Sequence, residues 1–208
     1  MKSKTAVAIL VLCAFAVSGH AAQKGKKKKV TARDYANTIA ILQTDMGDIT
    51  LKFHYDKAPK HVENFVDLAA KGFYDGTMFH RVIPGFMIQG GDPLTKKAEA
   101  PGRPYGTGGN VDATGKEVRI KAEFNDTPHK RGVVSMARAS DPNSASSQFF
   151  IVVKDSNFLD NQYSAFGEVV SGMEVADKIV AVPRNSSDRP NQPVRIKKVA
   201  LSQAKSLS

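Results

Sequence analysis

The residues best suited to chemistry lie in the stretch FHRVIPGFMIQGGD, from Phe79 to Asp92. Arg81 stands among apolar neighbours, and its guanidinium is a rigid fork of donors that stays protonated. Either its stem lies along apolar surface with the charged head in water, or the guanidinium is held in an apolar hollow as a donor to a substrate. His80 has the side chain of a general base, but strand alternation turns it to the face opposite Arg81 and Phe79. We therefore interpret His80 as a buried, hydrogen-bonded structural residue.

The other polar residues do not indicate a metal, nucleotide or covalent site. No cluster of Cys, His or carboxylates has metal-ligand spacing, and no Ser/His/Asp set is indicated by spacing. Gly115-Lys116 follows a glycine-rich run, but Asn110 and Glu117 stand where a phosphate-binding loop needs Gly and then Ser or Thr. We expect no metal and no cofactor.

Short strands must position Arg81. The runs Met78–Ile83 and Phe86–Gln89 have strand length, and Pro84-Gly85 suits the centre of a type II turn between them. Further strands are expected at Thr38–Thr44, Ile49–Phe53, Val133–Arg138, Gln148–Lys154 and Phe166–Val170, the first two forming a hairpin. In the last strand the apolar residues stand at even positions up to Ile196 and at odd positions from Val199. A bulge near Lys197-Lys198 would bring both sets to the same face of the sheet.

Two helices are expected among these strands. Pro59 suits a first helical position, and Val62, Phe65, Val66 and Ala69 follow as one apolar stripe that ends before Gly72. Residues 172–182 form the second helix, which Pro183 ends. Many short strands with only two helices indicate a closed antiparallel barrel.

The N-terminus differs in composition from the rest of the chain. Residues 1–22 have the parts of a signal peptide: two lysines, a run of twelve mostly apolar residues that includes Cys13, and small residues for cleavage. Residues 23–37 are a lysine-rich flexible arm, and residues 38–204 are the folded domain. Much of the net charge of +10 lies in this leader and arm, because 22 basic and 19 acidic residues remain from Asn37 onward. We expect no nucleic-acid partner and no membrane span.

Two segments closely resemble those of a known family. Tyr74–Gly91 resembles the signature segment of the cyclophilins, the peptidyl-prolyl cis-trans isomerases, and Ser135–Arg138 with Ser147–Ile151 resembles their second pocket-forming segment. The resemblance covers about Thr38 to Leu201. It implies a mainly β fold, namely a closed eight-stranded antiparallel barrel capped by two α-helices. It also implies an enzyme that accelerates rotation about X-Pro bonds in exported proteins without a covalent intermediate.

The resemblance assigns the site residue by residue. It makes Arg81, Phe86 and Gln148 catalytic, and it makes Met87, Gln89, Ala137, Arg138, Phe150, Phe158, Leu159 and Tyr163 substrate-binding. In this interpretation Arg81 donates to the proline nitrogen, apolar side chains hold the pyrrolidine ring, and the two glutamines hold the peptide and the arginine. The partners are proline-containing polypeptides, and we expect a monomer.

Three positions depart from the commonest eukaryotic pattern of the family. Arg138 replaces an asparagine, Phe158 a tryptophan and Tyr163 a histidine, so we expect weak cyclosporin binding. The departures resemble bacterial members, which with the leader predicts a periplasmic or secreted enzyme. A eukaryotic secretory location stays open as the alternative.

A second function also stays open, that of a proline-peptide-binding chaperone module with little catalysis. Retention of Arg81 argues against it, because pure binding needs no donor at the proline nitrogen.

Overall fold

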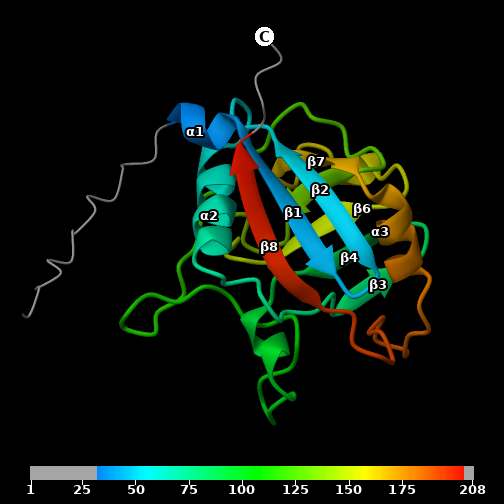
Figure 1. The fold of residues 1–208 in the computed structure, drawn as a ribbon. Coiled ribbons are helices and arrows are strands. Elements are labelled where there is room, and N and C mark those ends of the chain that lie inside the picture. The colour runs from blue at the N-terminus through cyan, green and yellow to red at the C-terminus, as the bar shows by residue number, and fades with distance from the viewer. Residues whose placement is uncertain (1–31, 204–208) are drawn as a thin grey trace, which may run out of the picture.

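The computed structural model describes residues 32–203 of the chain. The predicted signal peptide and most of the predicted arm lie outside the described residues, as does residue 204. One eight-stranded antiparallel sheet dominates the fold, in the order β3-β4-β6-β5-β7-β2-β1-β8 (Figure 1). Its strands are β1 Thr38–Thr44, β2 Gly47–Phe53, β3 Arg81–Ile83, β4 Met87–Gly90, β5 Val133–Met136, β6 Phe149–Val152, β7 Ala165–Ser171 and β8 Ile196–Gln203.

The sheet is strongly curved but open, so the prediction of a closed barrel is wrong. Its edge strands β3 and β8 do not pair, although the segment before β3 meets the start of β8 through a bridge between Met78 and Arg195 and through backbone hydrogen bonds such as that from Ile196 to the Thr77 carbonyl at 2.8 Å. The reason lies in β3, which has three residues instead of the six expected. The amide of Val82 on this strand donates to the carbonyl of Asp188 at 2.8 Å, so the loop before β8 covers the edge where a closing strand would pair.

The pairing of β1 with its two neighbours confirms two details. β1 and β2 form the expected hairpin, in register from Ile39–Lys52 to Thr44–Gly47. On the other side Gln43 pairs with Lys198 and Thr44 with Ile196, which leaves Lys197 as the extra residue of a bulge. The bulge restores the inward direction of apolar side chains on both sides of it, as the change of parity predicted.

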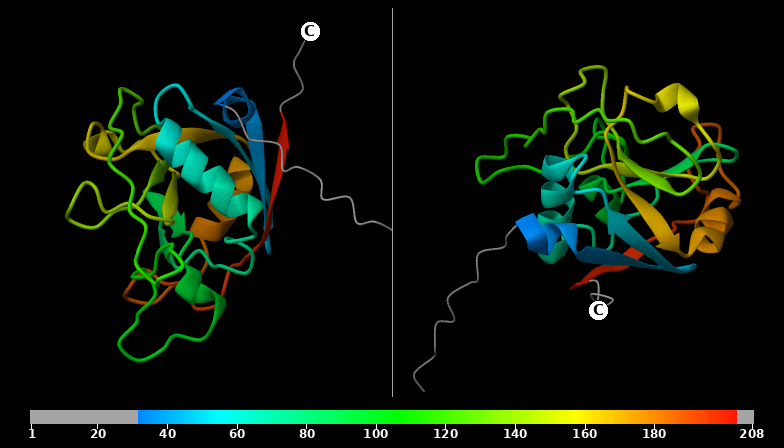
Figure 2. Two further views of the ribbon diagram at one scale, coloured as in Figure 1. Left: turned by 90° about the vertical axis from the view of Figure 1, so that its left-hand side faces the viewer. Right: turned by 90° about the horizontal axis from the view of Figure 1, so that it is seen from above.

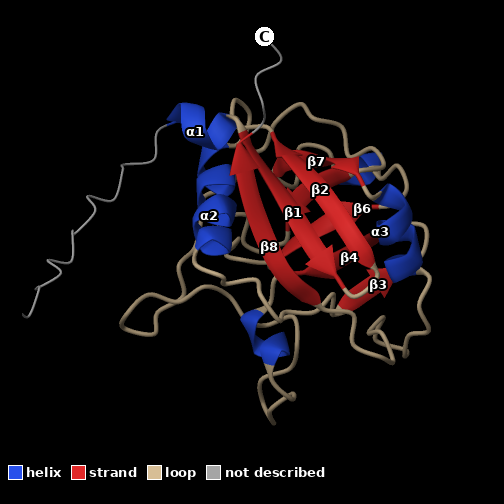
Figure 3. Ribbon diagram, in the orientation of Figure 1, coloured by secondary structure: helices blue, strands red, loops and turns tan. Residues whose placement is uncertain are grey.

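In the described part of the chain three α-helices, not two, accompany the sheet. They are α1 Ala32–Ala36, α2 Pro59–Ala70 and α3 Met173–Val180, and 3-10 turns span Pro93–Lys96 and Asn157–Leu159. α2 lies at the left and α3 at the right of the curved sheet in Figure 3, and both bury apolar side chains in the same core. The predicted apolar stripe of α2, from Val62 to Ala69, is buried. α3 begins after Gly172, whose φ of 91° and close approach to the Asp48 carbonyl suit only glycine.

The short helix α1 corrects the prediction of a flexible arm for its last residues, Ala32–Ala36. Its Tyr35 stacks on Tyr55 with ring centroids 5.9 Å apart, and the Tyr35 hydroxyl donates to Asp67 on α2 at 2.9 Å. Burial and this carboxylate together raise the pKa of Tyr35 to about 12. α1 therefore belongs to the folded domain and lies at one end of α2 (Figure 2).

The apolar interior has two parts. Phe65, Tyr74, Phe149 and Phe166 form an aromatic centre between the sheet and the helices, all with at most 1% of their surface exposed. A second, smaller cluster contains Met87, Val133, Phe150, Val152, Leu159 and Ala165. Strand alternation in β6 separates the two, because Phe149 points into the main core and Phe150 into the second cluster. The second cluster forms the floor of the candidate site.

Candidate active site

The hairpin of β3 and β4 places Arg81 beside Gln89, since the two residues are register partners. The tight turn between the strands has Gly85 at a φ of 74°, and the amide of Phe86 donates to the carbonyl of Ile83 at 3.0 Å. This is the predicted Pro84-Gly85 turn, in which a positive φ at the second central residue favours glycine. A polar pair therefore stands on a short, rigid hairpin.

One pocket joins most of the residues assigned from the resemblance. It has a volume of about 370 Å³ and is lined by Arg81, Phe86, Met87, Gln89, Ala137, Arg138, Phe150, Phe158, Leu159 and Tyr163. Met87, Phe150 and Leu159 are buried and form its apolar floor. Phe86 and Phe158 pack at the rim with ring centroids 5.3 Å apart, and Phe158 is 65% exposed. The pocket thus has apolar walls, an aromatic rim and two arginines.

The Arg81 guanidinium remains available to a ligand. Its side chain is 46% exposed, and its Nε lies 3.9 Å from the carboxylate of Asp188, too far for a hydrogen bond. Phe79 does not share its face, because β3 begins only at Arg81 and Phe79 is buried in the main core. The regular alternation assumed for residues 78–83 is therefore wrong, although Arg81 does face the pocket.

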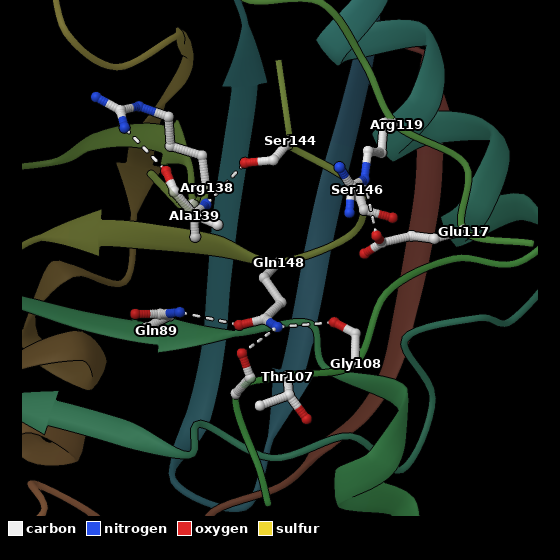
Figure 4. Close-up of a pocket in the computed structure, with 12 residues that line it drawn as sticks. Gln89, Thr107, Gly108, Glu117, Arg119, Arg138, Ala139, Ser144, Ser146 and Gln148 are labelled. Carbon is white, nitrogen blue, oxygen red and sulfur yellow. Dashed lines mark hydrogen bonds and ion pairs between the residues drawn. The ribbon is translucent and has the colours of Figure 1, made fainter. Parts of the chain in front are cut away.

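Gln148 lies in an adjoining pocket and not in the pocket of Arg81 (Figure 4). Its side-chain amide donates to the carbonyls of Gly106 at 3.0 Å and Gly108 at 2.7 Å, and its Oε1 accepts from Nε2 of Gln89 at 2.9 Å. Two carbonyl acceptors fix the orientation of the Gln148 amide. Gln89 must then donate to it, and the Oε1 of Gln89, which has no partner among residues 32–203, is an acceptor in the pocket of Arg81.

His80 lies outside both pockets, as its predicted structural role requires, and it is 6% exposed. Neither ring nitrogen has a partner of standard hydrogen-bond geometry among the described residues, although the backbone of Met78 interacts with the ring. Burial lowers the pKa of His80, and the nearby carboxylate of Asp92 opposes this only in part. The ring is therefore neutral near pH 7 and takes no part in the pocket.

The sequence analysis missed the second pocket. Its further lining residues are Gly106, Thr107, Gly108, Glu117, Arg119, Ala139, Ser144 and Ser146. Most belong to two long loops, whose side chains follow no strand or helix period. The run of glycines from 102 to 115 was the available signal, because Gly108 and Gly109 approach Asp92 and Ser146 too closely for a Cβ atom.

In residues 32–203, no three His, Cys, Asp or Glu side chains come together as a metal site. No helix in this range has both the length and the apolar character needed to cross a membrane.

Comparisons with known proteins agree with the geometry. Residues 39–201 match the family model described as cyclophilin type peptidyl-prolyl cis-trans isomerase/CLD. The chain is 40% identical to a peptidyl-prolyl cis-trans isomerase of Acinetobacter baylyi, over 80% of this chain and 87% of the relative. It is 43% identical to peptidyl-prolyl cis-trans isomerase A of Dickeya dadantii, over 81% and 84%.

A solved structure extends the comparison to three dimensions. The cyclophilin type isomerase of Cryptosporidium parvum, determined in the presence of the dipeptide Ala-Pro, superposes with a TM-score of 0.69 at 32% identity. The match covers 79% of this chain and 99% of that one. The chain therefore belongs to the family of cyclophilin-type peptidyl-prolyl cis-trans isomerases.

Proposed function

We propose that this isomerase turns over X-Pro bonds in the pocket of Arg81, with no covalent intermediate. The observation that carries the proposal is a half-exposed guanidinium that lines a pocket with an apolar floor and lies too far from Asp188, at 3.9 Å, to be hydrogen-bonded to it. The buried side chains of Met87, Phe150 and Leu159 suit a pyrrolidine ring, and the Oε1 of Gln89 suits a peptide N–H.

Isomerisation needs only preferential binding of a twisted amide. Delocalisation of the nitrogen lone pair gives the planar bond a rotational barrier of about 18–20 kcal/mol. At the transition state the nitrogen is pyramidal and accepts a hydrogen bond, which it cannot do when planar. A donor at that nitrogen therefore stabilises the transition state more than either ground state.

Arg81 is suited to be that donor. A hydrogen bond to a charged group contributes about 1.5–3 kcal/mol, and each 1.4 kcal/mol changes a rate about tenfold. Arg81 thus accounts for one to two decades of rate. Binding of an already twisted substrate in the apolar pocket must supply the remainder.

The test is Arg81→Ala in an isomerisation assay on a short Ala-Pro peptide. We expect kcat/KM to fall by about one to two decades with the thermal midpoint unchanged. Arg184→Ala is the matched control, because Arg184 contacts the same Asp188 at 3.3 Å but lines neither pocket. Equal rates for wild type and Arg81→Ala would remove Arg81 from the mechanism. If the wild type binds the peptide but does not accelerate its isomerisation, the chaperone alternative is supported instead.

We also propose that the enzyme acts on exported proteins as a periplasmic or secreted monomer. The support is the leader-like composition of residues 1–22 and the similarity to bacterial relatives. Fractionation of cells expressing the full chain, with mass spectrometry of its N-terminus, tests export. An uncleaved protein in the cytosol would contradict it, and analytical sedimentation tests the monomer.

A further inference from the structure

Arg138 differs from the other arginines that line the two pockets. Arg119 is paired with Glu117 at 2.9 Å, and Arg81 has the Asp188 carboxylate at 3.9 Å. Within residues 32–203 no carboxylate lies within ion-pair distance of Arg138. Arg138 also lines both pockets, together with Gln89 and Ala137. It is therefore an unpaired cation at the junction of the two pockets.

The guanidinium of Arg138 is oriented by neutral groups only. Its Nε donates to the carbonyl of Gln162 at 3.1 Å, and its Nη1 donates to the carbonyls of Ala139 and Ser140. Its Cζ stands 4.6 Å from the centre of the Tyr163 ring. These contacts fix the plane of the guanidinium but do not neutralise its charge. Nη2 has no acceptor in the described part of the chain, so it can donate to a ligand.

Arg138 lies within reach of the substrate residues that flank a bound proline. The Tyr163 ring, on which Arg138 stacks, makes an edge contact with Phe150 on the pocket floor at 5.7 Å. The Tyr163 ring thus lies between the Arg138 guanidinium and Phe150, in contact with both. An extended peptide advances about 3.3–3.6 Å per residue, so a side chain one or two residues from the proline can reach Arg138. In Figure 4 the Glu117–Arg119 pair stands across the adjoining pocket from Arg138.

We propose that Arg138 is a specificity-determining residue that selects peptides with an acidic side chain within two residues of the proline. A carboxylate there would accept from Nη2 and replace water around a charge that the protein leaves unbalanced. This inference rests on the proposed function, and it names the substrate class of that site. The expected preference for Glu over Gln is about two- to fivefold in kcat/KM, the upper part of the range of an exposed ion pair.

The experiment compares peptides that are identical except for Glu, Gln or Lys at one position, either one or two residues from the proline. With wild type we expect the order Glu, Gln, Lys, and a Glu-to-Gln ratio that shrinks between about 0.05 and 1 M salt. Turnover of the Gln peptide tests the proposed function separately. If the Gln peptide is not turned over, the proposed function fails. If the Gln and Glu peptides react equally, only the present inference fails.

Charge reversal supplies the second arm. Arg138→Glu should abolish the Glu preference and favour the Lys peptide, whatever its absolute rate. Lys198→Glu is the matched control, because it changes the net charge by the same two units and Lys198 is exposed on β8 and lines neither pocket. It should keep the wild-type ratio. A structural role for Arg138 alone would lower all three rates together and leave the ratios unchanged, which would overturn the inference. Should Arg138→Glu fail to fold, Arg138→Gln takes its place, since it removes the charge and should lose the Glu preference while Arg81 is unchanged.

Discussion

At the scale of single residues, Gln148 acts on the catalytic pocket from outside it. Its amide holds Nε2 of Gln89 and so directs the Oε1 of Gln89 towards the substrate. Without this contact the Gln89 amide is free to rotate, and half of its orientations present a donor where the pocket needs an acceptor. Gln148 is therefore a positioning residue.

We predict that Gln148→Ala lowers kcat/KM by about three- to tenfold, the effect of one neutral hydrogen bond of about 0.5–1.5 kcal/mol. The measurement is peptide turnover at several substrate concentrations. Gln203→Ala is the control, because its amide bonds to the Asp34 carbonyl and to Thr38, which line neither pocket. An unchanged rate in Gln148→Ala would show that Gln89 is oriented without it.

We expect the rim residue Phe158 to govern the affinity for cyclosporin. Its ring is 65% exposed and packs on Phe86, so it offers apolar cover but no donor. An indole at this position adds an N–H and a larger face. We predict weak cyclosporin binding by the wild type and at least several-fold tighter binding by Phe158→Trp, since one hydrogen bond changes affinity by up to about tenfold.

Titration of both proteins with the inhibitor checks this prediction. Phe124→Trp is a matched control, because Phe124 is 42% exposed but lies outside both pockets. If Phe158→Trp binds no better than wild type, the geometry set by Arg138 and Tyr163 controls the rim instead.

Most of the catalytic pocket could be predicted because its residues sit in two contiguous motifs. Arg81, Phe86, Met87 and Gln89 lie within nine positions, and a hairpin of fixed register brings them together. The role of Gln148 could not be read in the same way. Its partners are carbonyls of Gly106 and Gly108, which carry no side-chain signal, and a loop of irregular backbone brings them to it.

At the scale of elements, α2 is capped by a residue far away in sequence. Ala58 at its N-cap has no side-chain oxygen, and the carboxylate of Glu123 accepts from the amides of Lys60 and His61 at 3.1 and 3.0 Å instead. Two of the free amides of the first turn are thus satisfied by the long loop. The cap ties that loop to the helix.

We predict that Glu123→Ala lowers the free energy of unfolding by about 0.5–2 kcal/mol, the usual cost of losing a helix cap. Chemical denaturation measures it. Asp126→Ala removes a neighbouring carboxylate whose only described ion pair, with Lys57, is exposed, so it should change stability little. Equal effects of the two substitutions would refute the capping role.

The arm and α1 should behave differently on truncation. Deletion of residues 23–31 from the mature chain should leave the thermal midpoint unchanged, because the domain beyond it is nearly balanced in charge. Deletion of residues 23–36 should lower it, since the Tyr35–Tyr55 stack and the bond to Asp67 are lost. If the shorter deletion already lowers the midpoint, the lysine-rich arm packs on the domain.

The elements that could be predicted well are those whose own residues show a characteristic pattern. The stripe and Pro59 identify α2, and the change of parity identifies the bulge in β8. Closure of the sheet has no such signal, because it depends on whether β3 meets β8 or the loop that contains Asp188. The five-residue helix α1 was missed for a similar reason, since it is held by Tyr55 and Asp67 and not by its own propensity.

At the scale of the whole molecule, three buried histidines connect stability to pH. His61, His80 and His129 are 0%, 6% and 1% exposed. Burial lowers the pKa of each, and the carboxylates of Glu123, Asp92 and Asp160 oppose this only in part. All three rings are therefore neutral in the folded protein at a pH where an unfolded chain begins to bind protons.

The sign of the effect follows from this difference. Below the ordinary histidine pKa of 6.5 the unfolded state binds more protons than the folded state, so acid favours unfolding. Each histidine contributes a slope of up to about 1.4 kcal/mol per pH unit, which continues until its own folded pKa is reached. Stability is complete above pH 6.5 and falls as the pH drops below it.

We predict that the free energy of unfolding is lower at pH 5.5 than at pH 7.5, and that His61→Asn reduces this difference. Asn keeps a donor where Nδ1 of His61 lies 2.6 Å from Glu123, but it does not titrate. Urea denaturation at both pH values measures the difference. Gln203→Ala should retain the full wild-type difference, because it removes no titratable group. Equal wild-type stability at the two pH values would mean that burial does not lower the pKa of these histidines in the folded protein, and would contradict the prediction.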